Sequence, residues 1–339
     1  MTQTPHGPVR VTIAQIEVSN DHAANLLVVR SAFAEAQRLH ADLLVLPEYA
    51  SGFDPRGVGI EHAEPLDGPF VTTLQRWAGE TGVAVIAGTT IPGSRAPLVG
   101  VAGHGGTSSS HGSTPSDGTA VRDRSDPSGL PDTAVDPAGA ARDASTSTPV
   151  STRAETSERP ARAVNAVVAI DAQGRLSGVY RKVHLYDAFG HRESDRLEPG
   201  PADAPPTVLR VGSLTFGVMT CYDLRFPEAA RRLVDAGADV LVVPAAWAAG
   251  DLKADHWRTL ARARAIENTA VVLAVGQAGK GVTGRSLLVG PDGQVGLELD
   301  ERAGLRTADI DPEALAAVRR TNPSLANRRY AVVPAADQP

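Results

Sequence analysis

The sequence predicts an α/β fold, because short apolar runs alternate with segments of helical periodicity. The runs are rich in Val, Leu and Ile and are bounded by Gly, Pro and Asp, as strands are. Turn signals at residues 171–174 and 291–293 indicate hairpins between neighbouring strands. Alternating units combined with hairpins indicate either one mixed sheet or a pair of sheets covered by helices.

Each element is assigned from its own pattern. The predicted strands span residues 11–18, 43–46, 83–87, 166–170, 176–183, 214–219, 240–243, 270–275, 286–289 and 296–299. The predicted helices span residues 23–40, 227–236 and 254–268. In the first of these helices apolar residues such as Leu26 and Phe33 alternate with polar ones such as Arg30 and Arg38, which is typical of an amphipathic helix.

Residues 94–160 interrupt this pattern. The stretch has no aromatic residue, no isoleucine and only two leucines, Leu98 and Leu130, and it is crowded with Ser, Thr, Gly, Pro and Asp. Such a composition does not bury enough apolar surface to offset the entropy lost on ordering. We therefore expect a disordered insertion between two strands of one domain.

Composition excludes several classes of function. The chain has 339 residues, 42% of them hydrophobic, and a net charge of −6, so it has no basic surface for nucleic acid. Its N-terminus lacks the basic and apolar regions of a secretory signal, and no apolar run is long enough to span a bilayer. One cysteine excludes an intrachain disulfide and a cysteine-rich metal site. A cytoplasmic location is expected.

The single cysteine, Cys221, follows an apolar strand and precedes a predicted helix. A thiol at such a junction is held by the sheet yet open to a cleft, and a nearby helix N-terminus favours its thiolate. Burial as an inert core residue is the alternative interpretation, because free cysteine is among the most buried residue types.

Two other polar residues also stand next to apolar strands. Glu48 follows residues 43–46, and Lys182 lies in the segment from residue 176 to residue 186. Each has a second interpretation, Glu48 as a solvated loop acid and Lys182 as a surface cation on an edge strand. A carboxylate, an ammonium group and a thiol are together the functional groups that acyl transfer requires: a base, an oxyanion donor and a nucleophile.

Three segments match the signature blocks of one superfamily, in that family's order. They are Leu46-Pro47-Glu48, residues 180–187 (YRKVHLYD) and residues 221–228 (CYDLRFPE). Residues 192–200 and 243–247, the latter followed by 256–268, are further matches. On these segments the chain resembles the nitrilase, or carbon-nitrogen hydrolase, superfamily. The Cys-Tyr-Asp block is similar to that of the Nit-type amidases, which include omega-amidases and deaminated glutathione amidase.

The resemblance implies a four-layer α-β-β-α sandwich with two stacked mixed sheets. It implies one carbon-nitrogen hydrolase domain over residues 9–336, interrupted by the insertion at 94–160. It also implies a homodimer, with the C-terminal segment 322–333 crossing to the partner. A small-molecule amide is the expected ligand. No cofactor, metal, nucleic acid or membrane partner is expected.

The resemblance also implies the roles of the site residues. Glu48 is the expected general base, Lys182 the oxyanion cation and Cys221 the nucleophile, with Glu193 in a supporting role. The backbone N–H of Tyr222 is a second expected oxyanion donor, because it directly follows the nucleophile.

Other residues near these blocks have both functional and structural interpretations. Tyr49, Phe53, Tyr222 and Trp247 are candidates for the substrate pocket or for the core. His184 is expected to be a hydrogen-bonded, partly buried histidine. Arg225 and Glu228 are expected to form an ion pair at the start of a helix, with a substrate role as the alternative, and Asp223 is expected to cap that helix. Arg225 and Arg192 are the candidates for a cation that binds a substrate carboxylate.

The predicted function is cysteine-dependent hydrolysis of a small linear amide, one bearing a carboxylate, to acid and ammonia through a thioester. Hydrolysis of a nitrile or an N-carbamoyl amino acid is the alternative within the superfamily, and a catalytically silent small-molecule-binding homologue is the non-enzyme alternative. The chain has no complete phosphate-binding loop, no helical pair of metal-binding histidines and no Gly-x-Ser-x-Gly elbow. Nucleotide-binding proteins, metal hydrolases and serine hydrolases are therefore disfavoured.

Overall fold

The computed structural model describes residues 7–94 and 161–335, which form two six-stranded sheets. The first sheet has the strand order β12-β1-β2-β3-β4-β5 and the second β11-β10-β9-β8-β7-β6. The first is built from β1 (Val9–Gln15), β2 (Leu43–Val45), β3 (Ala84–Pro92), β4 (Ala163–Ile170), β5 (Leu176–Arg181) and β12 (Gly304–Ile310). The second is built from β6 (Val208–Val211), β7 (Leu214–Val218), β8 (Val240–Ala245), β9 (Val271–Gly276), β10 (Leu287–Val289) and β11 (Val295–Glu298).

Both sheets are mixed. In the first sheet β1, β2 and β3 run parallel, and in the second β7, β8 and β9 do so. The outer strands of each sheet pair antiparallel. Parallel neighbours need a crossover connection, and in each sheet helices supply it. The predicted hairpins at residues 171–174 and 291–293 join β4 to β5 and β10 to β11.

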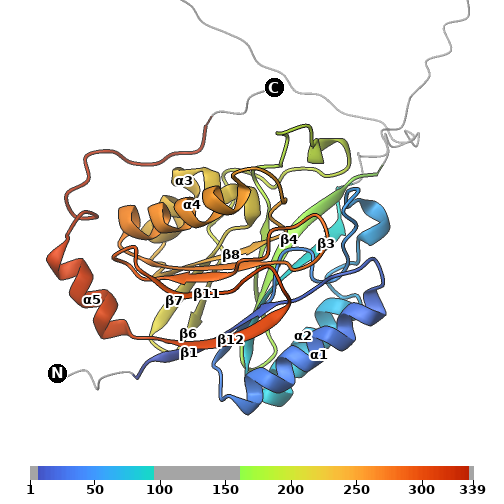
Figure 1. The fold of residues 1–339 in the computed structure, drawn as a ribbon, viewed down its shortest axis with the longest axis horizontal. Helices are drawn as coiled ribbons and strands as arrows, with labels where there is room; N and C mark the ends of the chain where they lie inside the picture. The colour runs from blue at the N-terminus through green and yellow to red at the C-terminus, as the bar shows by residue number, and fades with distance from the viewer. Residues whose placement is uncertain (1–6, 95–160, 336–339) are drawn as a thin grey trace, which may run out of the picture. The chain divides into compact units, whose positions relative to one another are not determined.

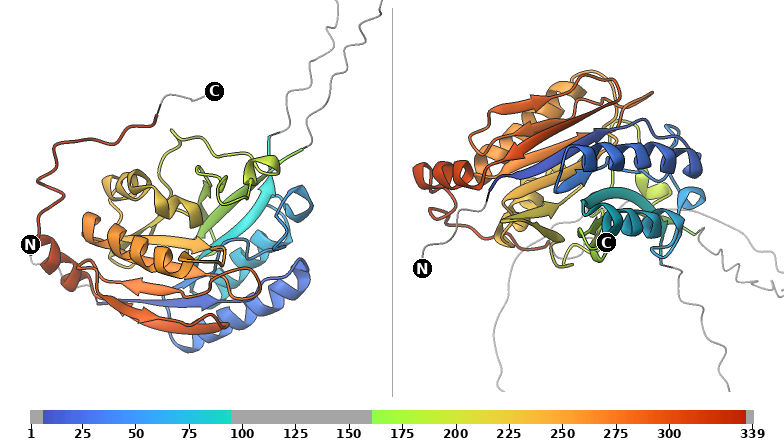
Figure 2. Two further views of the ribbon diagram at one scale, coloured as in Figure 1. Left: turned by 45° about the horizontal axis from the view of Figure 1, so that its top comes forward. Right: turned by 90° about the horizontal axis from the view of Figure 1, so that it is seen from below.

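Helices cover the outer face of each sheet (Figures 1 and 2). Helices α1 (His22–Arg38) and α2 (Pro69–Thr81) pack on the first sheet, where Phe33 and Phe70 join its buried cluster. Helices α3 (Pro227–Asp235) and α4 (Lys253–Asn268) pack on the second sheet, with Trp257 fully buried. The predicted four-layer α-β-β-α sandwich is therefore confirmed.

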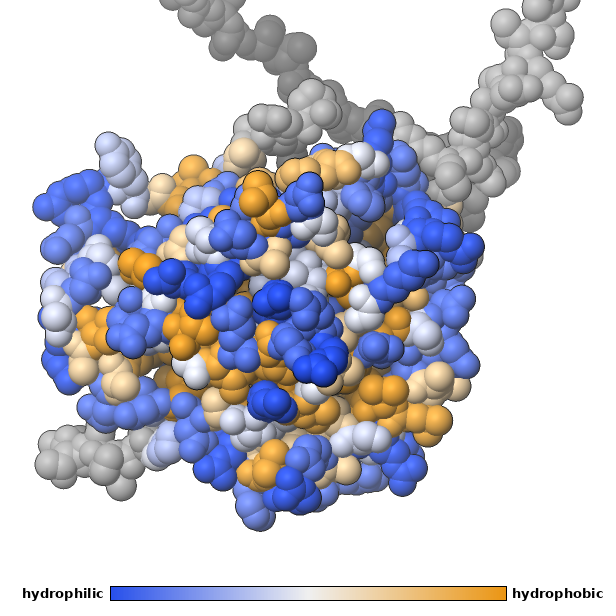
Figure 3. Space-filling model, in the orientation of Figure 1, coloured by the Kyte–Doolittle hydropathy of each residue, from blue (hydrophilic) through white to orange (hydrophobic). Residues whose placement is uncertain are grey.

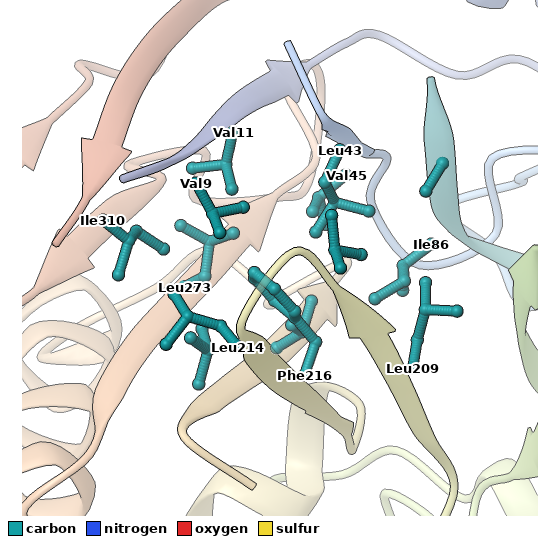
Figure 4. Close-up of a cluster of buried hydrophobic side chains, with 14 of the residues drawn as sticks. Val9, Val11, Leu43, Val45, Ile86, Leu209, Leu214, Phe216, Leu273 and Ile310 are labelled. Atoms are coloured by element: carbon teal, nitrogen blue, oxygen red, sulfur yellow. The ribbon is translucent and has the colours of Figure 1, made fainter. Parts of the chain in front are cut away.

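The central core lies between the two sheets (Figure 4). Successive side chains of a strand point to opposite faces, so Leu43 and Val45 enter this core while Leu44 packs beneath the helices. Phe216 and Val218 meet them from the second sheet. Because both faces of the central strands are covered, these strands are apolar at consecutive positions, which is why they stand out in the sequence.

Two strands and two helices were missed by the sequence prediction. Strand β6 carries Arg210 and β12 alternates polar with apolar residues, so neither makes a continuous apolar run. Helices α2 and α5 (Pro312–Thr321) both begin with proline, and Asp311 caps α5 by accepting a hydrogen bond from the backbone of Glu313. Proline at the first helical position is a recognised start signal, so the sequence did contain evidence for both helices.

The predicted insertion at 94–160 lies outside the described residues except for Ser94. On either side of it, β3 and β4 are antiparallel neighbours, and Pro92 pairs with Ala163. The described chain therefore leaves and re-enters the first sheet at adjacent positions.

Hydrophobic residues lie in small groups among hydrophilic ones on the face shown in Figure 3. Within residues 7–94 and 161–335, no helix has the length and apolar character needed to cross a membrane.

Candidate active site

The polar residues selected from the sequence lie just beyond strand ends. Glu48 follows β2, Lys182 follows β5 and Cys221 follows β7. Ligands of open α/β sheets bind outside the carboxyl ends of strands, so this position suits a functional site. A cavity of about 180 Å³ opens here, and Glu48, Glu193 and Cys221 are among its lining residues.

Glu48 is buried and is held at both carboxylate oxygens. Its Oε1 accepts hydrogen bonds from Asn165 Nδ2 at 2.6 Å and Lys182 Nζ at 3.0 Å. Its Oε2 accepts one from the backbone N–H of Ala246 at 2.6 Å. Only 1% of the residue is exposed, so its predicted alternative as a solvated loop acid is wrong.

A glycine lets the backbone of Glu48 pass close to the next strand. A Cβ atom added to Gly88 on β3 would collide with the Glu48 Cα and would lie 2.7 Å from the Pro47 carbonyl oxygen. Both neighbours are backbone atoms and have little room to move. Gly88 therefore fixes the position from which the carboxylate enters the cavity.

Lys182 lies between two carboxylates. Its Nζ donates to Glu48 at 3.0 Å and to both oxygens of Glu193, at 3.0 and 2.9 Å. Burial alone would lower the pKa of Lys182, but the charges of Glu193 and Glu48 outweigh it and raise that pKa well above the ordinary lysine value. Lys182 is thus a permanently charged, buried cation, and the predicted alternative of a surface cation is wrong.

Glu193 connects this lysine to the wall of the cavity. It begins a short 3₁₀ turn, η2 (Glu193–Asp195), and accepts hydrogen bonds from the Tyr49 hydroxyl at 2.8 Å and from the Tyr186 backbone N–H at 2.7 Å. These donors fix the carboxylate that holds Lys182.

Cys221 begins the 3₁₀ turn η3 (Cys221–Arg225) and is 8% exposed in the cavity. Its φ of 47° is in the left-handed region, where residues other than glycine are strained. Burial, followed by the Glu48 charge, raises the pKa of the Cys221 thiol well above its ordinary value, while the charge of Lys182 acts in the opposite direction. The resting group is therefore the thiol, and a base must remove its proton before it can attack.

Asp223 is fully buried close to Cys221 in the sequence, and its expected role as the cap of α3 is wrong, because α3 has no side-chain cap. It accepts hydrogen bonds from the Tyr180 hydroxyl at 2.7 Å, the Thr220 backbone N–H at 2.9 Å and His184 Nδ1 at 2.7 Å. His184 is half-buried and stacks on Phe226, which agrees with its predicted structural interpretation. The carboxylate thus fixes the turn that carries Cys221.

The predicted aromatic residues line the cavity. Tyr49, Phe53, Tyr222 and Trp247 all contribute to its wall, and Trp247 is further held by a hydrogen bond from its indole N–H to the Lys253 carbonyl. The expected ion pair between Arg225 and Glu228 is not formed among the described residues. The Arg225 guanidinium instead lies 4.9 Å from the centre of the Trp247 ring, in the cavity wall.

Sequence reasoning missed two residues of the site, Asn165 and Lys253. Asn165 is the only polar residue of the otherwise apolar β4, and that isolated polarity was a usable signal. Lys253 begins α4 and lines the cavity although its neighbours in the sequence gave no sign of a buried cation.

In the ranges 7–94 and 161–335, no three His, Cys, Asp or Glu side chains gather closely enough to hold a metal ion. Glu48 and Glu193 instead accept hydrogen bonds from protein donors.

The sequence model of the family described as carbon-nitrogen hydrolase matches residues 10–102 and 142–320. The chain belongs to the carbon-nitrogen hydrolase family. It is 31% identical over 326 residues to a hydrolase of Mycobacterium tuberculosis strain H37Rv, a match that covers 92% of each protein. It is 44% identical over 172 residues to deaminated glutathione amidase of Escherichia coli O157:H7, which covers 51% of this chain and 64% of that enzyme. This second match thus spans less than two thirds of the relative's length.

Solved structures share the fold of this carbon-nitrogen hydrolase. Saccharomyces cerevisiae Nit3, described as a member of branch 10 of the nitrilase superfamily, aligns with a TM-score of 0.66 and 22% identity, over 97% of this chain and 99% of Nit3. An amidase from Nesterenkonia sp. aligns with a TM-score of 0.62 and 22% identity, over 94% of this chain and 97% of the amidase. The predicted resemblance to the nitrilase superfamily and its Nit-type branch is confirmed.

Proposed function

We propose that this carbon-nitrogen hydrolase is a cysteine amidase that converts a small linear amide to acid and ammonia. The observation that carries the proposal is the position of the chain's one cysteine, in a strained turn that lines a cavity together with Glu48, a buried carboxylate paired with Lys182. The match to deaminated glutathione amidase supports an amide as substrate.

In the first half of the reaction, Glu48 takes the proton of the Cys221 thiol as the sulfur attacks the amide carbonyl carbon. The carbonyl π electrons move to oxygen, and Lys182 and the Tyr222 backbone N–H stabilise that negative charge. The C–N bond then breaks as Glu48 returns the proton to nitrogen, so ammonia leaves and a thioester remains on Cys221.

In the second half, water replaces ammonia in the cavity. Glu48 removes one proton from the water as its oxygen attacks the thioester carbonyl. The C–S bond breaks, the acid leaves, and the proton on Glu48 returns to the sulfur. Each cycle therefore consumes one amide and one water, and the enzyme ends with the thiol with which it began.

The raised pKa of the Cys221 thiol supports the role of Glu48. A thiol that stays protonated at neutral pH needs a base within the site, and the held, buried carboxylate of Glu48 is that base. Lys182 keeps its proton throughout because Glu48 and Glu193 both stabilise its charge. Glu193 positions the lysine and is not assigned a proton transfer.

The reaction is tested by ammonia release from a panel at equal concentration: succinamate, ketoglutaramate, deaminated glutathione, simple aliphatic amides, N-carbamoyl amino acids and nitriles. We expect the amides to be the best substrates. If nitriles or N-carbamoyl amino acids are hydrolysed faster than every amide, the amidase assignment is wrong. If the protein binds these compounds but releases ammonia from none, the catalytically silent alternative replaces it.

We also propose that residues 9–336 form one carbon-nitrogen hydrolase domain with an insertion at 94–160. The family's sequence model leaves out residues 103–141, which lie inside the proposed insertion, and this supports it. A cytoplasmic location belongs to the same proposal, and fractionation of cells that express the protein tests it.

A homodimer is the proposed assembly, formed with the help of the C-terminal segment 322–333. Tyr330 is 92% exposed and Val333 is 76% exposed in the single chain, so the segment carries apolar side chains that a partner would cover. Light scattering at micromolar concentration should give the mass of two chains, and a monomer mass would contradict the proposal.

A further inference from the structure

Asn165 is a fully buried polar residue in the otherwise apolar strand β4, and its side chain makes one hydrogen bond among the described residues. Its Nδ2 donates to Glu48 Oε1 at 2.6 Å, whereas its Oδ1 is buried and has no partner in the same ranges. A buried polar group costs free energy unless it is hydrogen-bonded. The opposite orientation of the amide would place its oxygen against a carboxylate oxygen. The contact with Glu48 therefore sets the orientation of this side chain.

The backbone of Asn165 contacts the other member of the buried ion pair. Its carbonyl accepts a hydrogen bond from the Lys182 N–H at 2.8 Å, next to the antiparallel pairing of β4 with β5. The Lys182 side chain in turn donates to Glu48 Oε1 at 3.0 Å. One residue of β4 thus holds both the carboxylate and the backbone of its cation.

The two carboxylate oxygens of Glu48 differ in the hydrogen bonds that they accept. Oε1 accepts from Asn165 Nδ2 and from Lys182 Nζ. Oε2 accepts from the Ala246 backbone N–H at 2.6 Å and, within residues 7–94 and 161–335, from no second donor. A carboxylate offers about four lone-pair sites, two on each oxygen. Both sites of Oε1 are therefore filled, and Oε2 keeps one site for a proton.

We propose that Asn165 positions the general base: together with Lys182 it fills Oε1, so that Oε2 takes the proton of Cys221. In this step the S–H bond breaks, an O–H bond forms at Oε2, and the electron pair left on sulfur attacks the amide carbon. The inference rests on the proposed amidase function, and it assigns the proton transfer to one atom. Asn165 itself exchanges no proton and acts through the carboxylate that it orients.

Gln277 offers a matched comparison. It is 1% exposed, its Nε2 donates to the Glu48 backbone carbonyl at 3.0 Å, and its Oε1 is buried without a hydrogen-bond partner in the described part of the chain. The two residues thus place the same amide group, almost equally buried, against the same neighbour. Of the two, Asn165 reaches the carboxylate. Loss of the Gln277 amide should therefore leave the donors at the carboxylate oxygens unchanged.

Other titratable groups face Glu48 from neighbouring segments. They are Tyr49, Lys182, Cys221 and, across Lys182, Glu193. Burial raises the pKa values of Tyr49 and Cys221. Burial lowers the pKa of Lys182, but the charges of Glu193 and Glu48 outweigh it and raise that pKa well above the ordinary value. These three groups therefore do not titrate in acid, and a Glu193→Gln background removes the remaining carboxylate from the comparison.

The pH dependence of two reactions of the full chain tests the proposal. One is amide hydrolysis, and the other is modification of Cys221, the chain's one thiol, by methyl methanethiosulfonate, which needs no turnover. Asn165→Leu keeps the size of the side chain but removes the donor, and Asn165→Asp keeps the shape but replaces the donor with a carboxylate. Each should move the acid limb of both profiles to higher pH by about one pH unit or more, because an ionised carboxylate loses a hydrogen bond.

Gln277→Met should leave the acid limb at its wild-type position. Acid limbs of the Asn165 variants that coincide with that of the wild type overturn the proposal. An equal shift in Gln277→Met also overturns it, and so does a shift that disappears in the Glu193→Gln background. Circular dichroism identifies the folded variants, and either Asn165 variant carries the test if the other unfolds.

The outcomes separate this inference from the proposed function. If the Asn165 variants shift the profile of thiol modification but the wild type hydrolyses no amide, the amidase assignment fails and the positioning role stands. If amides are hydrolysed but neither profile moves in the variants, the positioning role fails and the amidase assignment stands.

Discussion

Two groups of cations at the site are held differently, and we call Lys182 with its carboxylates the inner end and Lys253 with Arg225 the outer end. At the inner end, Lys182 is 3.0 Å from a Glu48 oxygen and 2.9 Å from a Glu193 oxygen. At the outer end, Lys253 and Arg225 contact aromatic rings, a hydroxyl and an imidazole, with no described carboxylate in salt-bridge range. Both lysines are nearly excluded from water, at 1% and 8% exposure, so solvent does not account for the difference.

The pKa shifts of Lys182 and Lys253 differ in the same way. Burial opposes the charge of both lysines, yet carboxylates raise the pKa of Lys182 whereas Arg225 adds to the lowering at Lys253. A cation that the protein has already neutralised is fixed in place for one reaction step. A cation that it has left unneutralised is available to a ligand. We therefore propose that the chemistry takes place at the inner end.

The largest effect is expected from changing Cys221, the proposed nucleophile. Cys221→Ala should abolish amide hydrolysis, because the chain has no other thiol. Cys221→Ser should be nearly as inactive, since a serine hydroxyl is far harder to ionise with a glutamate base. Ammonia release measures the loss, and circular dichroism checks that both variants remain folded. Hydrolysis by Cys221→Ala at the wild-type rate would show that the inner end does not work as we describe.

The next largest effect is expected from the inner charges themselves. Glu48→Gln keeps the shape of the side chain but cannot accept a proton, and Lys182→Met keeps its length but loses its charge. Each should lower kcat by about 100-fold or more. The double variant should lose much less than the product of the two effects, because the residues act as one unit. Effects that multiply independently would contradict a shared site.

A stability control accompanies this prediction. Lys182→Met leaves two carboxylates without their cation, and breaking a buried ion pair in this way costs about 3–5 kcal/mol. Urea unfolding measures that cost, and the kinetic comparison is then made at a temperature at which every variant is folded. Adding Glu193→Gln should recover part of the stability, since it removes one of the unpaired charges.

The outer end should show its own pH dependence. Because the pKa of Lys253 lies below the ordinary lysine value of 10.5, its charge disappears as the pH rises toward that value. Since the predicted amide bears a carboxylate, the ratio of kcat/KM for succinamate over butyramide should fall with rising pH, while contributions from Cys221 cancel in the ratio. Lys253→Arg should hold the ratio constant over the same range, because arginine keeps its proton. A wild-type ratio that is independent of pH would remove the distinction between the two ends.

The smallest effect is expected from residues 95–160, whose composition does not support a packed core. Replacing residues 95–160 with a short Gly/Ser linker should leave the melting temperature and kcat/KM close to those of the parent. Pro92 and Ala163 are paired neighbours, so a short linker can close the β3–β4 hairpin, and Ser94 is kept because it donates to Glu198. A large fall in either quantity would assign the segment a structural or functional role.

The inner end was predictable from sequence, whereas at the outer end Arg225 was a candidate and Lys253 was missed. Glu48 and Cys221 follow buried strands whose apolar runs are visible in the sequence, and Lys182 follows the partly exposed edge strand β5, so all three lie beyond strand ends. Lys253 and Arg225 lie at the start of a helix and in a short turn. Which side chains such segments point into a cavity depends on local backbone geometry, such as the left-handed φ of 59° at Leu252.

The errors in the fold prediction also concern segments that no continuous apolar run marks in the sequence. Central strands are covered on both faces, so continuous apolar runs identify them in the sequence. In contrast, β6 and β12 carry polar residues at exposed positions. Asp223 was assigned to the following helix by its position in the sequence. In the fold it binds groups on other segments, Tyr180 and His184, and no local pattern specifies such long-range partners.

The most direct test of the central claim, a thioester on Cys221, is the partitioning of the acyl group between water and hydroxylamine. An amide and the methyl ester with the same acyl group are hydrolysed separately at one hydroxylamine concentration, and hydroxamate and acid are quantified. Both substrates should give the same hydroxamate-to-acid ratio, because both pass through the same acyl-enzyme. Absence of hydroxamate, or a ratio that depends on the leaving group, would contradict the account.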